Sequence, residues 1–251
     1  MDYDIAPFIE GWKYEPDSLT VRLIRGDDGR EKIQLRLDLG LLQLETDGRP
    51  DGARPHGFES VLDYLEDRAL GNDGTNGKGA DFTLSTDDCD ELLREGIQYY
   101  HRYLSFFHLG RYELVVRDTA RNLRLFAFVV AHAVDKDDHW RFDQYRPYVL
   151  MMNTRARATL RLQDRDFDGA LAIVDEGIQS IRAFLREHRH QEQEEACAEL
   201  EFLRQWRGKL RQDRPLGRKE RLERKLQEAI DAERYERAAE LRDRIERLGN
   251  S

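Results

Sequence analysis

The chain has 251 residues, of which 39% are hydrophobic and 36% charged, which is enough for one large domain or two small ones with a buried core. Its formal net charge of -9 argues against a general nucleic-acid coat, because neutralising phosphates requires clustered Lys and Arg. Two distant cysteines, no signal-peptide pattern and no apolar run near the roughly 20 residues that span a bilayer predict a cytoplasmic protein without disulfides.

The N-terminal region carries the pattern of a β-hairpin. Apolar and polar residues alternate over 19–25 and 31–45, on either side of the turn-forming pair Asp28-Gly29. In the second segment the apolar side chains change face near Gly40, which predicts a bulge at that position. One face carries Ile33, Leu35, Leu37 and Leu39, and the other carries Leu42 and Leu44.

A helix is predicted after the hairpin, because apolar residues between Phe58 and Leu65 recur at helical spacing. A hairpin alone is not stable in water, so this helix, or the helical region beyond it, must cover the apolar face of the strands. We therefore expect a small β plus α unit over residues 1–70. The Gly-rich residues 71–84 predict a flexible linker or loop after that unit.

A long helical region is predicted over residues 85–212, with Ser85 or Thr86 as the N-cap of its first helix. Two segments in it resemble tetratricopeptide-type helical hairpins, in which small residues let paired helices pack closely and an aromatic residue follows the inter-helix turn. The first segment carries Gly110, Tyr112 and Val115, and the second carries Phe167, Ala170, Val174 and Gly177. The resemblance implies a stacked antiparallel array with a groove.

The central region also departs from that family. Phe167 follows Tyr112 by 55 positions, whereas the family repeat is about 34 residues. In addition, Tyr103 is too large for a position where the family has a small residue. Longer helices or an inserted connection over 134–147 would account for the spacing. Within that stretch, Asp135–Trp140 lacks the glycine and the terminal glutamate of a calcium loop, and we expect a loop between helices there.

Residues 218–249 predict two short amphipathic helices with a break near 232–235. Apolar residues recur at helical spacing in both: Leu222, Leu226 and Ile230 in the first, and Ala238, Leu241, Ile245 and Leu248 in the second. Each apolar stripe is narrow, so a hairpin of these helices has little core of its own. We expect it to need a partner.

This C-terminal segment resembles the UVR motif, the helical hairpin at the C-terminus of the excision-repair helicase UvrB, which also occurs in the nuclease UvrC and in Clp-type protease regulators such as McsA and ClpC. The match is carried by Leu226, Ala229, Ile230, Glu233, Tyr235, Glu236, Ala238, Ala239, Leu241, Arg242, Asp243, Ile245 and Leu248. The resemblance implies pairing with a like hairpin on another molecule. It does not extend to repair chemistry, because the chain has neither a GxxxxGK(S/T) phosphate loop nor the paired CxxC zinc motifs of McsA-like proteins.

The sequence predicts neither a metal centre nor a catalytic site. His190, Glu194 and Cys197 would share a helical face, but structural zinc sites draw four ligands from closely spaced pairs. His101 and His108 lie in an aromatic stripe that is typical of a core or a groove lining. Because no GxSxG or HExxH motif is present, we expect a protein that is not an enzyme and has no cofactor.

Basic residues near the predicted strands offer a candidate site for a phosphate, a nucleotide or a carboxylate. The candidates are Arg36, Arg49, Arg54 and His56. The alternative is structural, with the arginines pairing with nearby aspartates to hold the turn-rich loop. A second basic block, over 204–219, follows an acidic segment; such a dipolar surface either steers a charged partner or solvates a helix pair.

Together the patterns predict a mainly α (α+β) fold, with an N-terminal β-hairpin or small sheet and a helix, a central tetratricopeptide-like antiparallel helical array and a C-terminal helical hairpin. They favour a non-enzymatic adaptor, linked to DNA excision repair or stress proteolysis. Its partner would be a UVR-type hairpin on another protein or a second copy; direct contact with nucleic acid or a membrane is not expected. The predicted partner-binding residues are Leu226, Ile230, Tyr235, Ala238, Leu241, Arg242 and Ile245. The alternative function is a sensor that binds a small anionic ligand or nucleotide through the Arg-rich loop.

Overall fold

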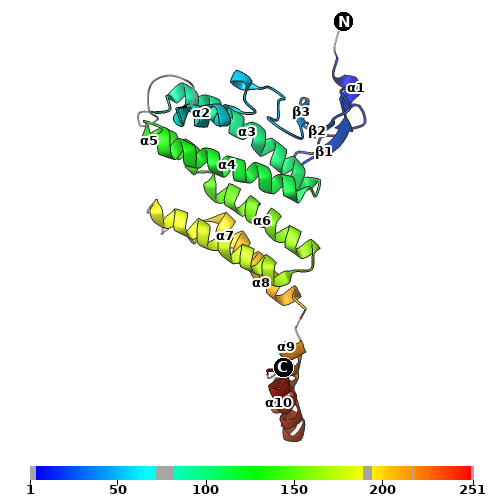
Figure 1. The fold of residues 1–251 in the computed structure, drawn as a ribbon. Helices are drawn as coiled ribbons and strands as arrows, with labels where there is room; N and C mark the ends of the chain where they lie inside the picture. Colours follow the sequence, from blue (N-terminus) through cyan, green and yellow to red (C-terminus); the bar gives the residue numbers. More distant parts are fainter. Residues whose placement is uncertain (1–3, 72–81, 189–193, 216–217, 250–251) are drawn as a thin grey trace. The chain divides into compact units, whose positions relative to one another are not determined.

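The computed structural model describes residues 4–71, 82–188, 194–215 and 218–249. The chain separates into two compact units, Met1–Arg207 and Gly208–Ser251 (Figure 1). The first contains a small antiparallel sheet and a set of long helices, and the second contains the end of the last of these helices and a pair of short helices. The predicted fold class, mainly helical with a small N-terminal sheet and a C-terminal hairpin, is confirmed. Most of the predicted linker or loop over 71–84 lies outside the described residues.

Three antiparallel strands form the sheet in the order β1 (Val21–Arg25), β2 (Glu31–Arg36) and β3 (Leu41–Glu45). The turn at Asp28-Gly29 joins β1 to β2 as predicted, and Gly29 takes a positive φ of 75° there. The helical region covers this sheet, because β2 packs against α3 (Thr86–His108). The expectation that helices must cover the apolar face of the strands is therefore confirmed.

The prediction of one strand over 31–45 with a bulge is wrong, because the chain reverses direction between Leu37 and Gly40. The N–H of Leu37 donates to the carbonyl of Gly40 at 2.9 Å, and Leu39 at the tip of this turn is 88% exposed. The apolar residues then face each other across β2 and β3, in the pairs Ile33–Leu44 and Leu35–Leu42. Directly paired residues lie on one face of a sheet, so these apolar residues of β2 and β3 share one face. The turn between the two strands accounts for the change of face that the alternation pattern suggested.

Two short helical elements and one longer helix accompany the sheet. They are α1 (Ala6–Ile9), the 3-10 turn η1 (Pro55–Gly57) and α2 (Val61–Ala69). The hydroxyl oxygen of Ser60 accepts from the N–H of Asp63 at 3.1 Å and so caps α2, which therefore begins later than the apolar pattern from Phe58 suggested. Leu62 and Leu65 of α2 are buried in a core shared with the helices that follow.

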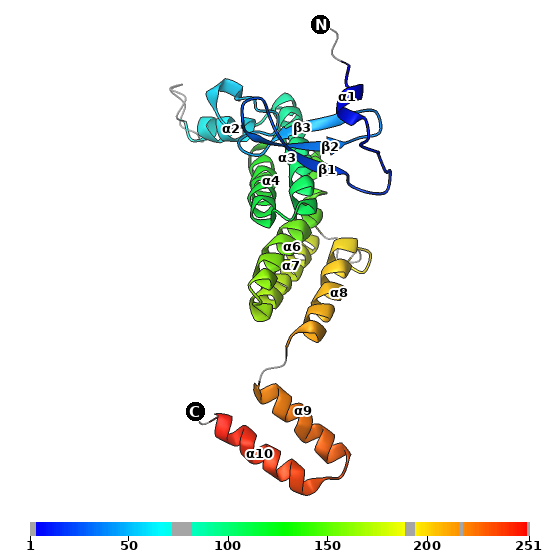
Figure 2. The same cartoon turned by 90° about the vertical axis from the view of Figure 1, so that its right-hand side faces the viewer.

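Long antiparallel helices make up most of the first unit (Figures 1 and 2). After α3 come α4 (Tyr112–His132), α5 (Lys136–Asp143), α6 (Arg146–Gln163), α7 (Phe167–Glu187) and α8 (Ala198–Asp213). Helix α4 packs between α3 and α6, and α6 packs in turn on α7. The predicted start of α3 is confirmed, because Ser85 and Asp88 form a reciprocal capping box at its N-terminus.

The expectation of a loop over Asp135–Trp140 is wrong, since most of this stretch belongs to α5. The carboxylate of Asp135 caps α5 by accepting from the N–H of Asp137 at 2.9 Å, and acidic residues in its first turn favour the helix. Both explanations for the long spacing between Tyr112 and Phe167 hold: α4 and α6 are 21 and 18 residues long, and α5 is inserted between them. The tetratricopeptide resemblance stays a prediction.

Three inter-helix turns share one geometry. In each, a residue with positive φ follows the helix, its N–H donates three residues back, and the next N–H donates five residues back, as in a Schellman motif. The positive-φ residues are Gly110 (72°), Arg165 (60°) and Glu233 (54°). The next helix begins two residues later with an aromatic side chain each time: Tyr112, Phe167 and Tyr235. The same turn geometry, followed by an aromatic residue, therefore joins the helices in α3–α4, in α6–α7 and in the C-terminal pair.

Candidate functional site

The C-terminal pair consists of α9 (Arg218–Asp231) and α10 (Tyr235–Gly249), which pack against each other as a hairpin (Figure 2). Its buried core contains Leu222, Ala229, Ala238 and Leu241, with Leu226 and Ile245 packed at the edge. A buried leucine contributes about 1.5–3 kcal/mol, and ordering each residue costs about 1–2 kcal/mol. Two leucines and two alanines therefore give this hairpin only marginal stability on its own.

The turn between α9 and α10 determines which residue begins α10. The N–H of Glu233 donates to the carbonyl of Ile230 at 2.9 Å, and that of Arg234 donates to Ala229 at 2.8 Å. These bonds satisfy carbonyl groups at the end of α9. They also fix Tyr235 as the first residue of α10, so two large apolar residues, Ile230 and Tyr235, flank the turn.

Both of these apolar side chains face solvent. Ile230 is 44% exposed and Tyr235 is 69% exposed. At the equivalent position after the first turn, Tyr112 is half-buried and lies edge-on to Phe107, with the ring centroids 5.3 Å apart. Helix α6 covers the aromatic residues at that turn, because the guanidinium of Arg155 in α6 lies 4.4 Å from the Phe107 ring centroid. In the described residues of the C-terminal hairpin, the aromatic residue after the turn has no comparable cover.

The structure divides the predicted partner-binding residues into two groups. Ala238 and Leu241 lie in the core of the hairpin, and Leu226 and Ile245 are partly covered at its edge. The exposed group is Ile230, Tyr235 and Arg242. Helical spacing identified the apolar stripe, but it could not tell whether the other helix or a partner covers each residue.

Charged side chains form short-range pairs on the described exposed surface of the hairpin. Arg237 lies 2.7 Å from Glu240, and Arg224 lies 3.5 Å from Glu228. Exposed pairs of this type add little stability. They keep the polar face solvated and can orient an incoming charged partner.

The predicted anion-binding residues do not form one site. Arg49 and Arg54 line the same cavity of about 540 Å³, but acidic residues line it too, and the Nε of Arg49 lies 3.4 Å from the buried carboxylate of Glu95. Arg36 is bound elsewhere, donating to the carbonyls of Trp12 at 3.1 Å and Gly40 at 2.8 Å. The ring of His56 stacks on Tyr64, and it does not line this cavity. Anion binding stays a prediction, which thermal shift against nucleotides would test.

Sequence reasoning missed a buried ionic network in the first unit. Arg102 and Asp118 are each 1% exposed, and Nε of Arg102 donates to Asp118 at 2.7 Å. Arg102 also donates to the carbonyls of Glu45 and Gly48, at 3.1 and 2.8 Å, and so ties the loop after β3 to α3. Glu95 accepts from the N–H of Val61 at 2.8 Å at the start of α2.

The signal for this network was present in the helical spacing of α3. Charged side chains occupy the same stripe as buried apolar ones: Leu92, Glu95, Tyr99, Arg102 and Phe106. Buried charges are tolerated when they are paired and hydrogen-bonded. Glu95 forms ion pairs with Arg49 and Arg121, and its carboxylate accepts from Arg121 and from the N–H of Val61. We therefore assign the network a structural role.

The structure describes two of the three candidate metal ligands, Glu194 and Cys197. His190 lies outside the described residues, and Glu194 lies in a turn, where it binds Arg182 at 2.8 Å and also contacts Arg204. Within the described residues, no group of three His, Cys, Asp or Glu side chains could hold a metal ion. Burial raises the pKa of the Cys89 thiol to about 12, so this thiol stays protonated at neutral pH.

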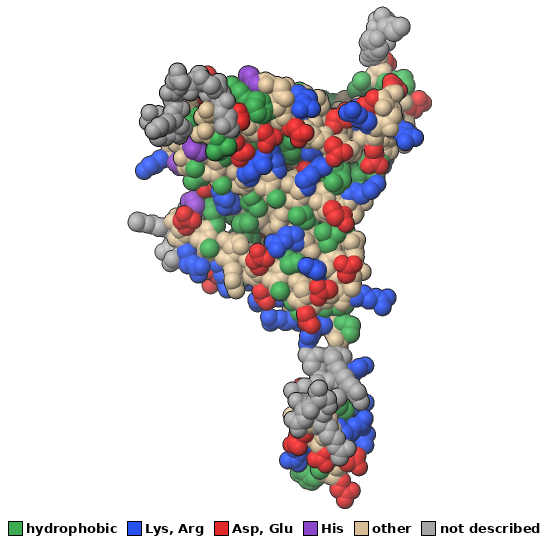
Figure 3. Space-filling view, viewed as in Figure 1, with side chains coloured by type: hydrophobic (Ala, Val, Ile, Leu, Met, Phe, Trp, Pro, Cys, Tyr) green, Lys and Arg blue, Asp and Glu red, His purple; other side chains and the backbone are tan. Residues whose placement is uncertain are grey.

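The basic block over 204–219 is partly neutralised where the structure describes it. Arg207 binds Asp175 at 2.8 Å, and Arg204 binds Glu194. The face of the molecule seen in Figure 3 carries Lys and Arg side chains interspersed with Asp and Glu. These pairings favour solvation of the helices over steering of a charged partner. Among the described residues, no helix is long and apolar enough to cross a membrane.

The geometry defines the C-terminal hairpin as a two-helix module with a small core and exposed apolar residues at its turn. Comparison with protein families agrees: the family model for UVR, the UvrB/uvrC motif, matches residues 217–251. This confirms the resemblance of the C-terminal hairpin to the UVR motif, which suggests an interaction module. No curated protein and no solved structure matched the chain.

Proposed function

We propose that the chain is a non-enzymatic adaptor that binds a partner protein through its C-terminal hairpin. The observation that carries this proposal is the exposed pair Ile230 and Tyr235 in a segment that matches the UVR motif. Aromatic residues are frequent hot spots of protein interfaces. The hairpin's core is small, so a partner that covers Tyr235 would also stabilise the folded hairpin.

The partner we propose is another UVR-type helical hairpin, on a different protein or on a second copy of this chain. Such a hairpin presents a matching narrow apolar stripe between charged faces, and its charges can pair with those around Arg242. The proposed pathway is DNA excision repair or stress proteolysis, where UVR-type hairpins occur. The long helical unit would then hold a second partner.

The experiment separates docking from folding by changing only exposed residues. The double variant Ile230→Ser with Tyr235→Ser should keep the helical content of the protein and lose its association. The matched control is Gln227→Ser with Arg237→Ser, which changes one exposed polar residue in each helix and should leave association intact.

Association would be measured by light scattering coupled to size exclusion, and by titration of the full chain with purified UVR hairpins from candidate partners. A chain ending at Arg214 gives the baseline without the hairpin. If the double variant associates as strongly as the unmodified chain, the exposed pair is not the docking surface. If the truncated chain also does so, the hairpin has no docking role.

A further inference from the structure

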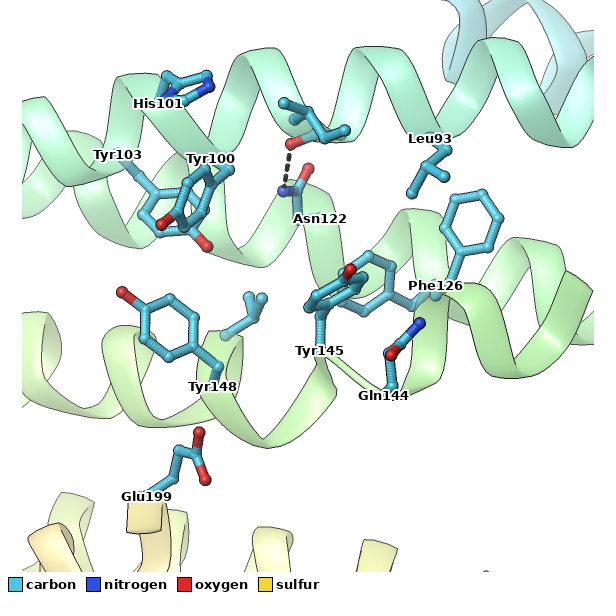
Figure 4. A pocket seen from close by; sticks show the side chains of 14 residues that line it. Leu93, Tyr100, His101, Tyr103, Asn122, Phe126, Gln144, Tyr145, Tyr148 and Glu199 are labelled. Carbon is cyan, nitrogen blue, oxygen red and sulfur yellow. Dashed lines mark hydrogen bonds between the residues drawn. The ribbon is translucent and has the colours of Figure 1, made fainter. Parts of the chain in front are cut away.

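The first unit contains a second feature of functional interest, a cavity of about 540 Å³ that is lined by residues of α3, α4, α6 and α8 and of the end of α5 (Figure 4). This volume lies within the roughly 300–1,000 Å³ of typical small-molecule sites. Aromatic side chains dominate its walls. Figure 4 shows Tyr100, Tyr103 and Tyr148 pointing toward one another from α3 and α6.

The aromatic rings are arranged as several walls of one cage. Tyr100 and Tyr103 are perpendicular, with centroids 5.6 Å apart, and the centroid of Tyr148 lies 6.2 Å from that of Tyr100. Tyr145 and Phe126 line the other end, where Tyr145 is 52% exposed. The face of an aromatic ring carries negative potential and attracts a cation within about 6 Å of its centroid.

One acidic side chain lines this cavity and no Lys or Arg does. Glu199, at the start of α8, points toward Tyr148 (Figure 4). Its carboxylate accepts from the thiol of Cys197 at 3.5 Å, and no Lys or Arg in the described part of the chain forms a salt bridge with it. His101 adds no fixed positive charge, because burial lowers its pKa.

Elsewhere in this fold, arginines of the chain already occupy such ring faces. The guanidinium of Arg121 lies 4.1 Å from the Tyr99 centroid. Near the cavity, Arg155 lies between Phe107 and Phe202. Arg146 is held by Asp143 and lies 5.9 Å from the centroid of Phe126, at the other end of the cavity. Among the described residues, no guanidinium lies over the rings of Tyr100, Tyr103 or Tyr148 in this way. The part of the cavity formed by Tyr100, Tyr103 and Tyr148 therefore has aromatic faces with no guanidinium over them, and the Glu199 carboxylate beside them.

We propose that this cavity binds an organic cation with an apolar body, such as a quaternary ammonium or a guanidinium compound. The cation would lie against Tyr100 and Tyr148, with Glu199 supplying the opposite charge. An anionic ligand would be repelled by Glu199, and a neutral one would desolvate this carboxylate without replacing its lost hydration. The proposal is independent of the docking hairpin.

Isothermal titration calorimetry on the full chain tests the proposal with matched pairs of probes. Choline is compared with 3,3-dimethylbutan-1-ol, in which carbon replaces the charged nitrogen, and N-acetylarginine amide is compared with N-acetylcitrulline amide. We expect at least one cation to bind about tenfold or more tightly than its neutral counterpart, as cation–π contacts and an opposite charge predict. The pair that shows the difference identifies the ammonium or the guanidinium class.

Variants locate the binding in the cavity. Glu199→Gln keeps the size of the side chain and should weaken the cation about tenfold, and Tyr148→Leu should weaken it further. Glu201→Gln, on the same helix but outside the cavity, should bind like the unmodified protein. Circular dichroism confirms that each variant is folded. Equal affinity for cations and neutral isosteres, no effect of Glu199→Gln, or no binding of any cation at millimolar concentration would overturn the proposal.

Discussion

Two helix pairs in this protein are built from the same turn and differ in what surrounds them. In α6–α7, Arg165 takes the positive φ, Phe167 begins the second helix, and the pair packs on α4 within a large core. In α9–α10, Glu233 takes the positive φ and Tyr235 begins the second helix, but the core of this pair has only four buried residues among those described. The comparison teaches that local sequence specifies a helical hairpin, whereas neighbouring layers decide whether its apolar residues become core or docking surface.

The largest expected effect comes from breaking the buried ion pair of the first unit. Asp118→Ala would leave the guanidinium of Arg102 buried without its carboxylate. Breaking a buried ion pair in this way costs about 3–5 kcal/mol, so the free energy of unfolding of the first unit should fall by that amount. Urea denaturation followed by circular dichroism measures it. The control is Asp47→Ala, which removes an 85% exposed partner of Arg117 and should have little effect.

The second prediction applies the same test to the small core of the hairpin. Leu241→Ala removes the most buried side chain of that core. Leu→Ala changes in cores cost about 2–5 kcal/mol, and the lower part of that range exceeds what a marginal hairpin can lose. Trypsin should therefore cleave the tail faster while the urea transition of the first unit stays unchanged. Gln227→Ala, at an exposed position, is the control; equal cleavage of both variants would show that the hairpin does not depend on its core.

A third variant probes close packing inside α6–α7. A Cβ added at Gly177 would lie 2.3 Å from Oγ1 of Thr154, a buried side chain on α6. The resulting clash should outweigh the gain in helix propensity, so that Gly177→Ala lowers the melting temperature with a net cost of about 1–3 kcal/mol. Gly208→Ala is the matched helical control, since no atom lies within 4 Å of its added Cβ. It should be neutral or stabilising.

The smallest effect concerns the shared turn itself. Glu233 holds a φ of 54°, which costs a side-chain-bearing residue about 1–2 kcal/mol, whereas glycine adopts it freely. Glu233→Gly should therefore stabilise the hairpin by about 1 kcal/mol, seen as slower tryptic cleavage of the tail. Gly110→Ala should have the opposite sign in the first unit, measured by urea denaturation. A destabilising Glu233→Gly would mean that its side chain matters more than the backbone angle.

Local patterns in the sequence determined much of this protein. The Asp28-Gly29 turn, the capped start of α3, the aromatic starts of α4 and α7 and the UVR-type tail could all be read from short stretches. Each depends on contacts between residues close in the chain, such as caps, turns and helical stripes. For the same reason the tail's identity was accessible without any knowledge of the rest of the fold.

Only the tertiary structure decided which patterned residues face each other. The pairing of β3 with β2, the burial of Arg102 against Asp118 and the meeting of Tyr100 with Glu199 in one cavity join residues that are distant in sequence. Periodicity shows that a face is apolar, but it does not show what covers that face. This is why Leu241 and Tyr235, both in the predicted docking stripe, ended in different environments: one inside the hairpin and the other exposed to solvent.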